Sequence, residues 1–191
     1  MVAFSEVRKD YNGVRKIWGK YWDGYGGFRA LFSSFYFYLA LFLTLINYGA
    51  WSEPGWWDTV ISSIPTILGF TLAGFAVFLG MDSGFSRFMA KRSKVSVSPF
   101  MSLVSAFVHF IVMQAIALIF ALTLKSLHFS IAGLPQWYYQ AVYWGNRFFW
   151  FLAYLAFMYS VVLVFSATFA IFRASRWYEA FVQTSDDSSG V

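Results

Sequence analysis

The stretch VISSIPTILGFTLAGFAVFLGM, residues 60–81, decides the fold of this chain because it runs for 22 residues without a charge. An α-helix rises about 1.5 Å per residue, so a helix of this length reaches about 33 Å. That is enough to cross the ~30 Å hydrocarbon core of a bilayer. The stretch therefore predicts a membrane-spanning helix and, with it, an integral membrane protein.

The composition of the whole chain agrees with this interpretation. Of its 191 residues, 59% are hydrophobic, 24% are aromatic and only 12% are charged, whereas about 25% are charged in an ordinary soluble domain. The chain contains no cysteine, which excludes disulfides, thiolate catalysis and cysteine metal sites. We expect an all-α integral membrane protein.

Three further apolar stretches are long enough to span. With residues 60–81 they predict a four-helix transmembrane domain over residues 28–176, with spans at about 28–48, 60–81, 99–124 and 148–172. Residues 1–27 precede it, and in this segment apolar side chains recur every three or four residues while most basic ones fall elsewhere on the wheel. This pattern predicts a basic amphipathic helix on a membrane surface. Residues 177–191 form the expected cytoplasmic tail.

The positions of lysine and arginine predict the orientation. Twelve of the fourteen lie before or at the very start of the first span, between the second and third spans, or after the fourth, and the other two are Lys125 and Arg147. Cytoplasmic segments of membrane proteins carry such an excess. We therefore expect a multi-pass membrane protein with both termini in the cytoplasm.

Small residues recur along one side of the second predicted span. They are Gly69, Ala73, Ala76, Gly80 and Gly84. Small residues at such spacings let two helix backbones approach closely, which favours helix association in lipid. We expect this face to be buried, either inside the chain or between copies in a homo-oligomer.

Two polar side chains fall deep inside the third predicted span, His109 and Gln114. A polar group in hydrocarbon must find partners, and we expect Ser102, Ser105 or Thr71 to serve His109. One hypothesis is a proton or pH sensor, or a ligand site within the bundle. The other is a hydrogen-bonded link between helices.

No Asp, Glu, Lys or Arg lies deep in a predicted span, and no catalytic or phosphate-binding motif is present. We expect no enzyme, no cofactor and no metal. The basic side chains are predicted to contact lipid headgroups or a cytoplasmic protein rather than nucleic acid. They are Arg15, Lys16, Lys20, Arg87, Lys91, Arg92 and Lys94.

The segment SIPTILGFTLAGFAVFLGM, a basic loop after it, and the segment SPFMSLVSAFVHF resemble small bacterial four-span inner-membrane proteins. Among these is the membrane subunit of the Kiwa anti-phage defence system. The resemblance implies an inner-membrane oligomer that senses events at the envelope and scaffolds a cytoplasmic effector. It concerns the four-span plan and transfers no functional residue.

Two hypotheses for function follow. The first is a membrane sensor or scaffold that oligomerises and recruits a cytoplasmic effector through its basic surface, because charge is concentrated on one side of an otherwise apolar bundle. The second is an oligomeric pore gated by a hydrophobic constriction, suggested by the small-residue face and by His109 and Gln114.

Overall fold

The computed structural model describes residues 2–90, 98–129, 131, 133 and 135–189. Over these ranges the chain is helical and contains no strand, which confirms the all-α prediction. The helices are α1 (Val2–Tyr25), α2 (Gly27–Phe32), α3 (Phe35–Ile46), α4 (Tyr48–Trp51), α5 (Trp56–Leu79), α6 (Ser83–Ala90), α7 (Pro99–Leu127) and α8 (Gln136–Ser189).

Three of these helices, α5, α7 and α8, are long and apolar enough to cross a membrane. They correspond to the second, third and fourth predicted spans. The start of α7 follows from its sequence, because Ser98 accepts a hydrogen bond from the Met101 amide and Pro99 occupies the first turn. Serine is a favoured N-cap, and proline is tolerated where the helix needs no amide donor.

The first predicted span, residues 28–48, is not one helix. It divides into α2, α3 and the beginning of α4, and α3 has only 12 residues, so it reaches about 18 Å and is too short to cross the hydrocarbon core. The break lies at Ser33 and Ser34. Ser34 is extended, with φ −76° and ψ 126°, and the Ser33 hydroxyl donates to the Ala30 carbonyl. Serine hydroxyls compete for backbone groups in this way.

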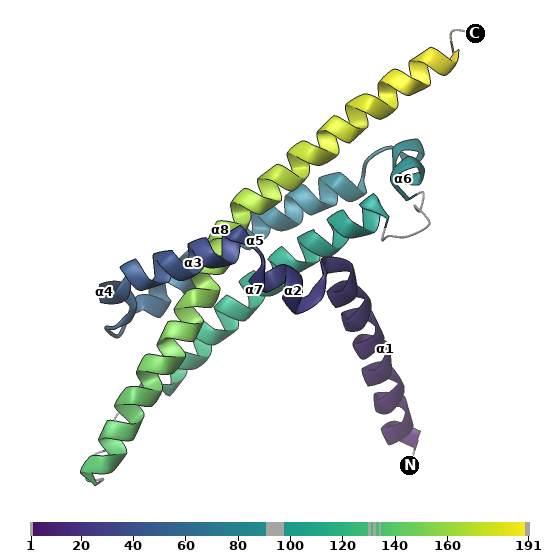
Figure 1. Ribbon diagram of the computed structural model, residues 1–191. Helices are drawn as coiled ribbons and strands as arrows, with labels where there is room; N and C mark the ends of the chain where they lie inside the picture. The colour runs from purple at the N-terminus through teal and green to yellow at the C-terminus, as the bar shows by residue number, and fades with distance from the viewer. Residues whose placement is uncertain (1, 91–97, 130, 132, 134, 190–191) are drawn as a thin grey trace.

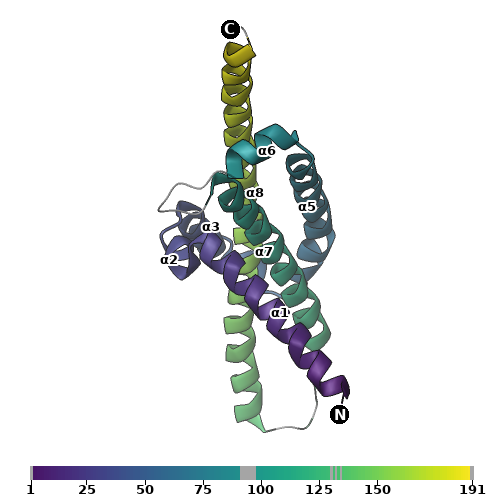
Figure 2. The ribbon, with the colours of Figure 1, turned by 90° about the vertical axis from the view of Figure 1, so that its right-hand side faces the viewer.

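The helices assemble around α7, which contacts α1, α5, α6 and α8, while α3 packs along α8. Figure 1 shows α5 and α7 beside the middle of α8, with α1 running away from the bundle toward the N-terminus. Figure 2, turned by 90°, shows α1 crossing α7 and α6 lying near the end of the bundle from which α8 continues to the C-terminus. We call this end the C-terminal end.

The opposite end holds a compact group of indole rings, and we call it the tryptophan end. Trp51, Trp56, Trp57 and Trp150 are all buried there, packed against α5, α7 and α8. A second core cluster lies nearer the C-terminal end and centres on phenylalanines of α5 and α7, including Phe78 and Phe107. The apolar interior is thus divided between two levels of the bundle.

Helix α8 is longer than expected at both ends. It has 54 residues and therefore reaches about 81 Å. Residues 136–147, which precede the fourth predicted span, already belong to the helix, and no break separates the domain from the predicted tail at residue 177.

Candidate functional site

A buried histidine links three helices through tyrosine hydroxyls. His109 of α7 is 1% exposed. The Tyr21 hydroxyl of α1 lies 2.9 Å from its Nδ1, and the Tyr159 hydroxyl of α8 lies 3.1 Å from its Nε2. The Tyr25 hydroxyl lies 3.2 Å from that of Tyr159, and the Tyr25 ring stacks on the imidazole with centroids 3.7 Å apart. We call these four residues the His109 cluster.

The sequence of α1 explains how two tyrosines reach the same histidine. Tyr21 and Tyr25 are four residues apart, so they share one face of the helix. Gly24 lies between them, and a Cβ built on it would collide with the Ser105 hydroxyl of α7. Glycine therefore lets α1 approach α7 without displacing the Ser105 side chain. Helix α1 continues past Gly24 to Tyr25 and ends where Gly26 and Gly27 adopt positive φ.

The donors and acceptors of the cluster fit a neutral imidazole. Burial raises the pKa of the Tyr21 phenol to about 12, and the neighbouring Tyr25 adds to this effect. Tyr21 therefore stays protonated at neutral pH. In a neutral imidazole, one ring nitrogen of His109 accepts from a tyrosine hydroxyl and the other donates its N–H to the second tyrosine. The cluster forms a continuous hydrogen-bonded path from α1 through α7 to α8.

The partners of His109 differ from those expected. Ser105 instead faces Gly24, and Thr71 bonds Gln114, whereas the long phenol side chains reach His109 from neighbouring helices. The tyrosines of the cluster were missed by sequence reasoning. The four-residue spacing on either side of Gly24, and the position of Tyr159 near the middle of the fourth predicted span, were the available signals.

Gln114 makes a second polar contact between helices. Its Nε2 donates to the Thr71 hydroxyl of α5 at 3.0 Å, and Thr71 in turn donates to the Ile67 carbonyl. Gln114 is fully buried, and within the described residues its Oε1 has no hydrogen-bond partner. One buried amide thus joins α7 to α5 and leaves one acceptor unused.

The small-residue face of α5 is open in the single chain. Gly69, Ala73, Ala76 and Gly80 are all exposed. Gly84 lies beyond the end of α5, in α6, where a Cβ would meet Asp82 and Phe181. The expected burial of this face inside the chain is therefore wrong for its first four members, and contact between copies stays a prediction.

The basic residues do not form one surface. Arg15, Lys16 and Lys20 are exposed on α1, which runs away from the C-terminal end in both views (Figures 1 and 2). Arg87 is exposed on α6 at that end. The other three, Lys91, Arg92 and Lys94, lie outside the described residues.

Polar contacts near the tryptophan end connect segments far apart in sequence. Arg147 Nη1 donates to the Tyr48 hydroxyl at 2.7 Å, and the guanidinium lies over the Tyr143 ring. Lys125 pairs with Asp58 at 2.8 Å, although both side chains are more than half exposed. Such exposed pairs contribute at most about 1 kcal/mol.

Comparison of this chain with protein-family models, with curated proteins and with solved structures finds no match. Among the described residues, no group of three or more His, Cys, Asp or Glu side chains lies close enough together to hold a metal ion.

Proposed function

We propose that this protein is a non-enzymatic scaffold of the bacterial inner membrane that forms homo-oligomers and recruits a cytoplasmic protein. The observation that carries the proposal is the length of α8. Its 54 residues reach about 81 Å, against a hydrocarbon core of ~30 Å. Of this length, residues 173–189 follow the predicted fourth span and reach about 25 Å beyond it. Such an extension presents a rigid helical surface to soluble proteins.

Helix α6 supports this extension of α8. Phe85 is 1% exposed and packs edge-on against Tyr178 with ring centroids 5.2 Å apart, and it also contacts Phe181. The Asp82 carboxylate accepts hydrogen bonds from the Gly84 and Phe85 amides and so fixes the start of α6. These contacts favour a preformed docking surface.

The charge of this surface suggests the chemistry of its partner. Arg87 of α6 and Arg173 and Arg176 of α8 are exposed. Among the described side chains they outnumber the exposed carboxylates of Asp82 and Glu179 at the same end. An excess of positive charge attracts an acidic surface and speeds its association. We therefore expect a cytoplasmic partner with an acidic contact surface.

The proposed orientation places the C-terminal end and the N-terminus in the cytoplasm and the tryptophan end outside. The cytoplasmic side of the N-terminus rests on the excess of Lys and Arg in residues 1–27, because α3 reaches only about 18 Å and α1 runs away from the C-terminal end (Figures 1 and 2). The absence of cysteine allows a direct test with single substitutions and a membrane-impermeant maleimide. Asn12→Cys and Ser175→Cys should label from the cytoplasmic side and Glu53→Cys from the other, and labelling of Asn12→Cys from the outside refutes this topology.

The exposed face of α5 supports assembly of several copies. In lipid, close packing of small residues is a main source of helix association. Ala73→Leu should lower the oligomeric mass measured in mild detergent, whereas Val77→Leu, at a side chain that is already large and 74% exposed, should not. Equal masses for both variants contradict this interface.

Crosslinking tests recruitment of the partner. A photo-crosslinking residue at Tyr178, at the C-terminal end, should capture one cytoplasmic protein in stoichiometric amount, and the same residue at Tyr48 should not. The double variant Arg87→Gln with Arg176→Gln should abolish capture, while the matched double variant Arg15→Gln with Lys16→Gln on α1 should retain it. Ion flux through liposomes containing the wild-type chain alone would instead support the pore hypothesis.

The resemblance to the Kiwa membrane subunit suggests that the recruited protein is an anti-phage effector. Cells that carry this chain with its neighbouring gene should then restrict phage plating, and the arginine variants that abolish capture should lose the restriction. Full restriction without capture argues against recruitment as the mechanism.

A further inference from the structure

A cavity of about 500 Å³ lies between α7 and α8 toward the tryptophan end. Its volume falls within the range of ~300–1,000 Å³ that is typical of small-molecule sites. Most of its lining is apolar, including Phe120 and Leu124 of α7 and Phe149 and Leu152 of α8. Neither helix fills this space with its own side chains.

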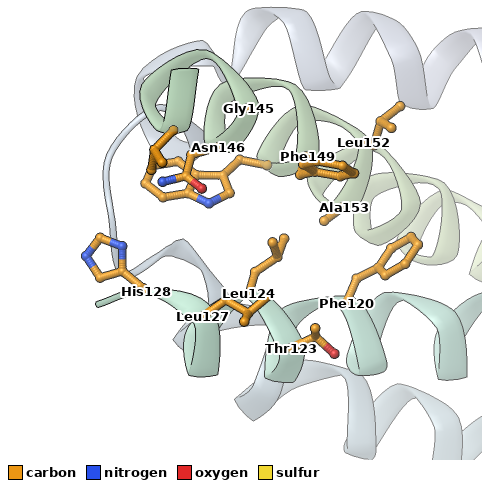
Figure 3. A pocket seen from close by; sticks show the side chains of 12 residues that line it. Phe120, Thr123, Leu124, Leu127, His128, Gly145, Asn146, Phe149, Leu152 and Ala153 are labelled. Atoms are coloured by element: carbon orange, nitrogen blue, oxygen red, sulfur yellow. The ribbon is translucent and has the colours of Figure 1, made fainter. Parts of the chain in front are cut away.

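The two ends of the cavity differ in polarity. Figure 3 shows His128 and Asn146 at one end and Phe120 and Leu152 at the other. His128 directly follows the last residue of α7, and Phe120 lies eight residues earlier, so the polar and apolar ends are about 12 Å apart along the helix. The gradient runs from the tip of the helix toward the middle of the bundle.

A second cavity of about 360 Å³ adjoins the polar end, since both are lined by His128, Asn146 and Trp150. It adds the two opposite charges of Arg147 and Glu53. The Arg147 guanidinium is held by its bond to the Tyr48 hydroxyl and by the Tyr143 ring. It has five N–H donors and uses one here, so others remain for a ligand.

We propose that these two cavities form one binding site for a zwitterionic glycerophospholipid with a primary-ammonium headgroup. An acyl chain occupies the apolar cavity, and the headgroup occupies the second cavity. Arginine suits phosphate because its planar donors match the phosphate oxygens. Glu53 is the complementary partner for the ammonium, so the site distinguishes such a lipid from an anionic one.

The orientation of the site agrees with that of a lipid in a bilayer. The polar end lies at the tryptophan end, where aromatic side chains are typical of the membrane interface, and the apolar end lies toward the interior of the bundle. The lipid tail gains little from burial alone, because the surrounding chains are equally apolar. Selectivity must therefore come from the fit of the tail and from the two charges at the headgroup.

Gly145 provides a variant that fills the apolar cavity. It lines this cavity, and a Cβ built on it meets nothing within 4 Å, so Gly145→Leu adds bulk without a backbone clash. Ala141→Leu is the matched control, because Ala141 is exposed on the same part of α8 and does not line the cavity. Circular dichroism and gel filtration in detergent check that both variants fold.

The test is a titration of the delipidated full-length chain in detergent, followed by native mass spectrometry. Phosphatidylethanolamine and phosphatidylglycerol with identical acyl chains are the probes. We expect one phosphatidylethanolamine per chain, bound at least about tenfold more tightly than phosphatidylglycerol, which corresponds to ~1.4 kcal/mol. Gly145→Leu should weaken phosphatidylethanolamine binding by a similar factor, and Ala141→Leu should not.

Glu53→Gln separates the headgroup from the tail. It should reduce the ratio of phosphatidylethanolamine affinity to phosphatidylglycerol affinity to about one, while both lipids still bind. An unchanged preference overturns the headgroup assignment. Equal binding by Gly145→Leu and Ala141→Leu, or binding of many lipids without saturation at one per chain, overturns the site and indicates surrounding bilayer lipid only.

Discussion

Removal of the Tyr21 hydroxyl should loosen the attachment of α1 to the bundle. Tyr21→Phe keeps the buried ring and deletes the group that lies 2.9 Å from His109 Nδ1. The deletion removes one hydrogen bond and leaves a buried ring nitrogen of His109 without a partner, which costs about 1–3 kcal/mol. Measured bonds between membrane helices average lower, at about 0.6 kcal/mol with a maximum of ~1.7.

We expect the free energy of docking of α1 to fall by about 1–2 kcal/mol, between the cost of an unpaired buried group and the average for bonds between membrane helices. This loss raises the population of undocked helix by about 5- to 30-fold. Distance measurements between spin labels at Ile17→Cys and Ile119→Cys report this population. Both positions are exposed, at 70% and 59%, so the labels should not disturb packing. The chain has no native cysteine to interfere.

Tyr11→Phe is the matched control, because it removes the same hydroxyl from the same helix at a side chain that is 71% exposed. It should leave the distance distribution unchanged. If Tyr21→Phe and Tyr11→Phe give the same distribution, the His109 cluster does not hold α1 in place and the reasoning is refuted.

Three further predictions concern stability in detergent, measured by thermal unfolding. Gly24→Ala should lower stability by weakening the contact of α1 with α7. Adding Ser105→Ala to this variant should restore stability, because it removes the hydroxyl that a Cβ at residue 24 would meet. Failure of this rescue contradicts the contact. Thr71→Val should cost about 1–2 kcal/mol by depriving the Gln114 amide of its acceptor, whereas Gln114→Leu should cost less because it also removes the unused oxygen. Trp51→Phe should cost about 1 kcal/mol more stability than Trp56→Phe. Trp51 Nε1 donates to the Thr44 carbonyl, whereas in the described part of the chain Trp56 Nε1 has no partner. Equal costs would show that the Trp51 bond contributes nothing.

Long apolar segments were predictable because their length alone fixes their structure. In hydrocarbon the backbone must satisfy its own hydrogen bonds, so an uncharged run such as residues 60–81 has little choice but to form a helix. The same rule failed for residues 28–48, where hydrophobicity is high but Ser33 and Ser34 interrupt the helix. A hydropathy argument averages over such a pair and overlooks its capping geometry.

The candidate sites were predictable only in part. The depth of His109 and Gln114 follows from their position in a span, and both are buried. Their partners could not be assigned, because the choice between a nearby serine and a distant tyrosine depends on how α1 and α8 cross α7. The lipid cavity was equally hidden, since Phe120 and Leu152 come from different helices and each is unremarkable in sequence.

The sequence by itself determined that this protein is helical and predicted four membrane spans, three of which are helices long enough to cross a membrane. Such predictions succeed because composition and run length act locally along the chain. Only the tertiary structure decided that Gly24 lets α1 touch Ser105, that tyrosines surround His109, and that the small-residue face of α5 is left open. These features depend on the crossing of helices in space, and side-chain contacts between helices are set by packing rather than by the periodicity of any one of them.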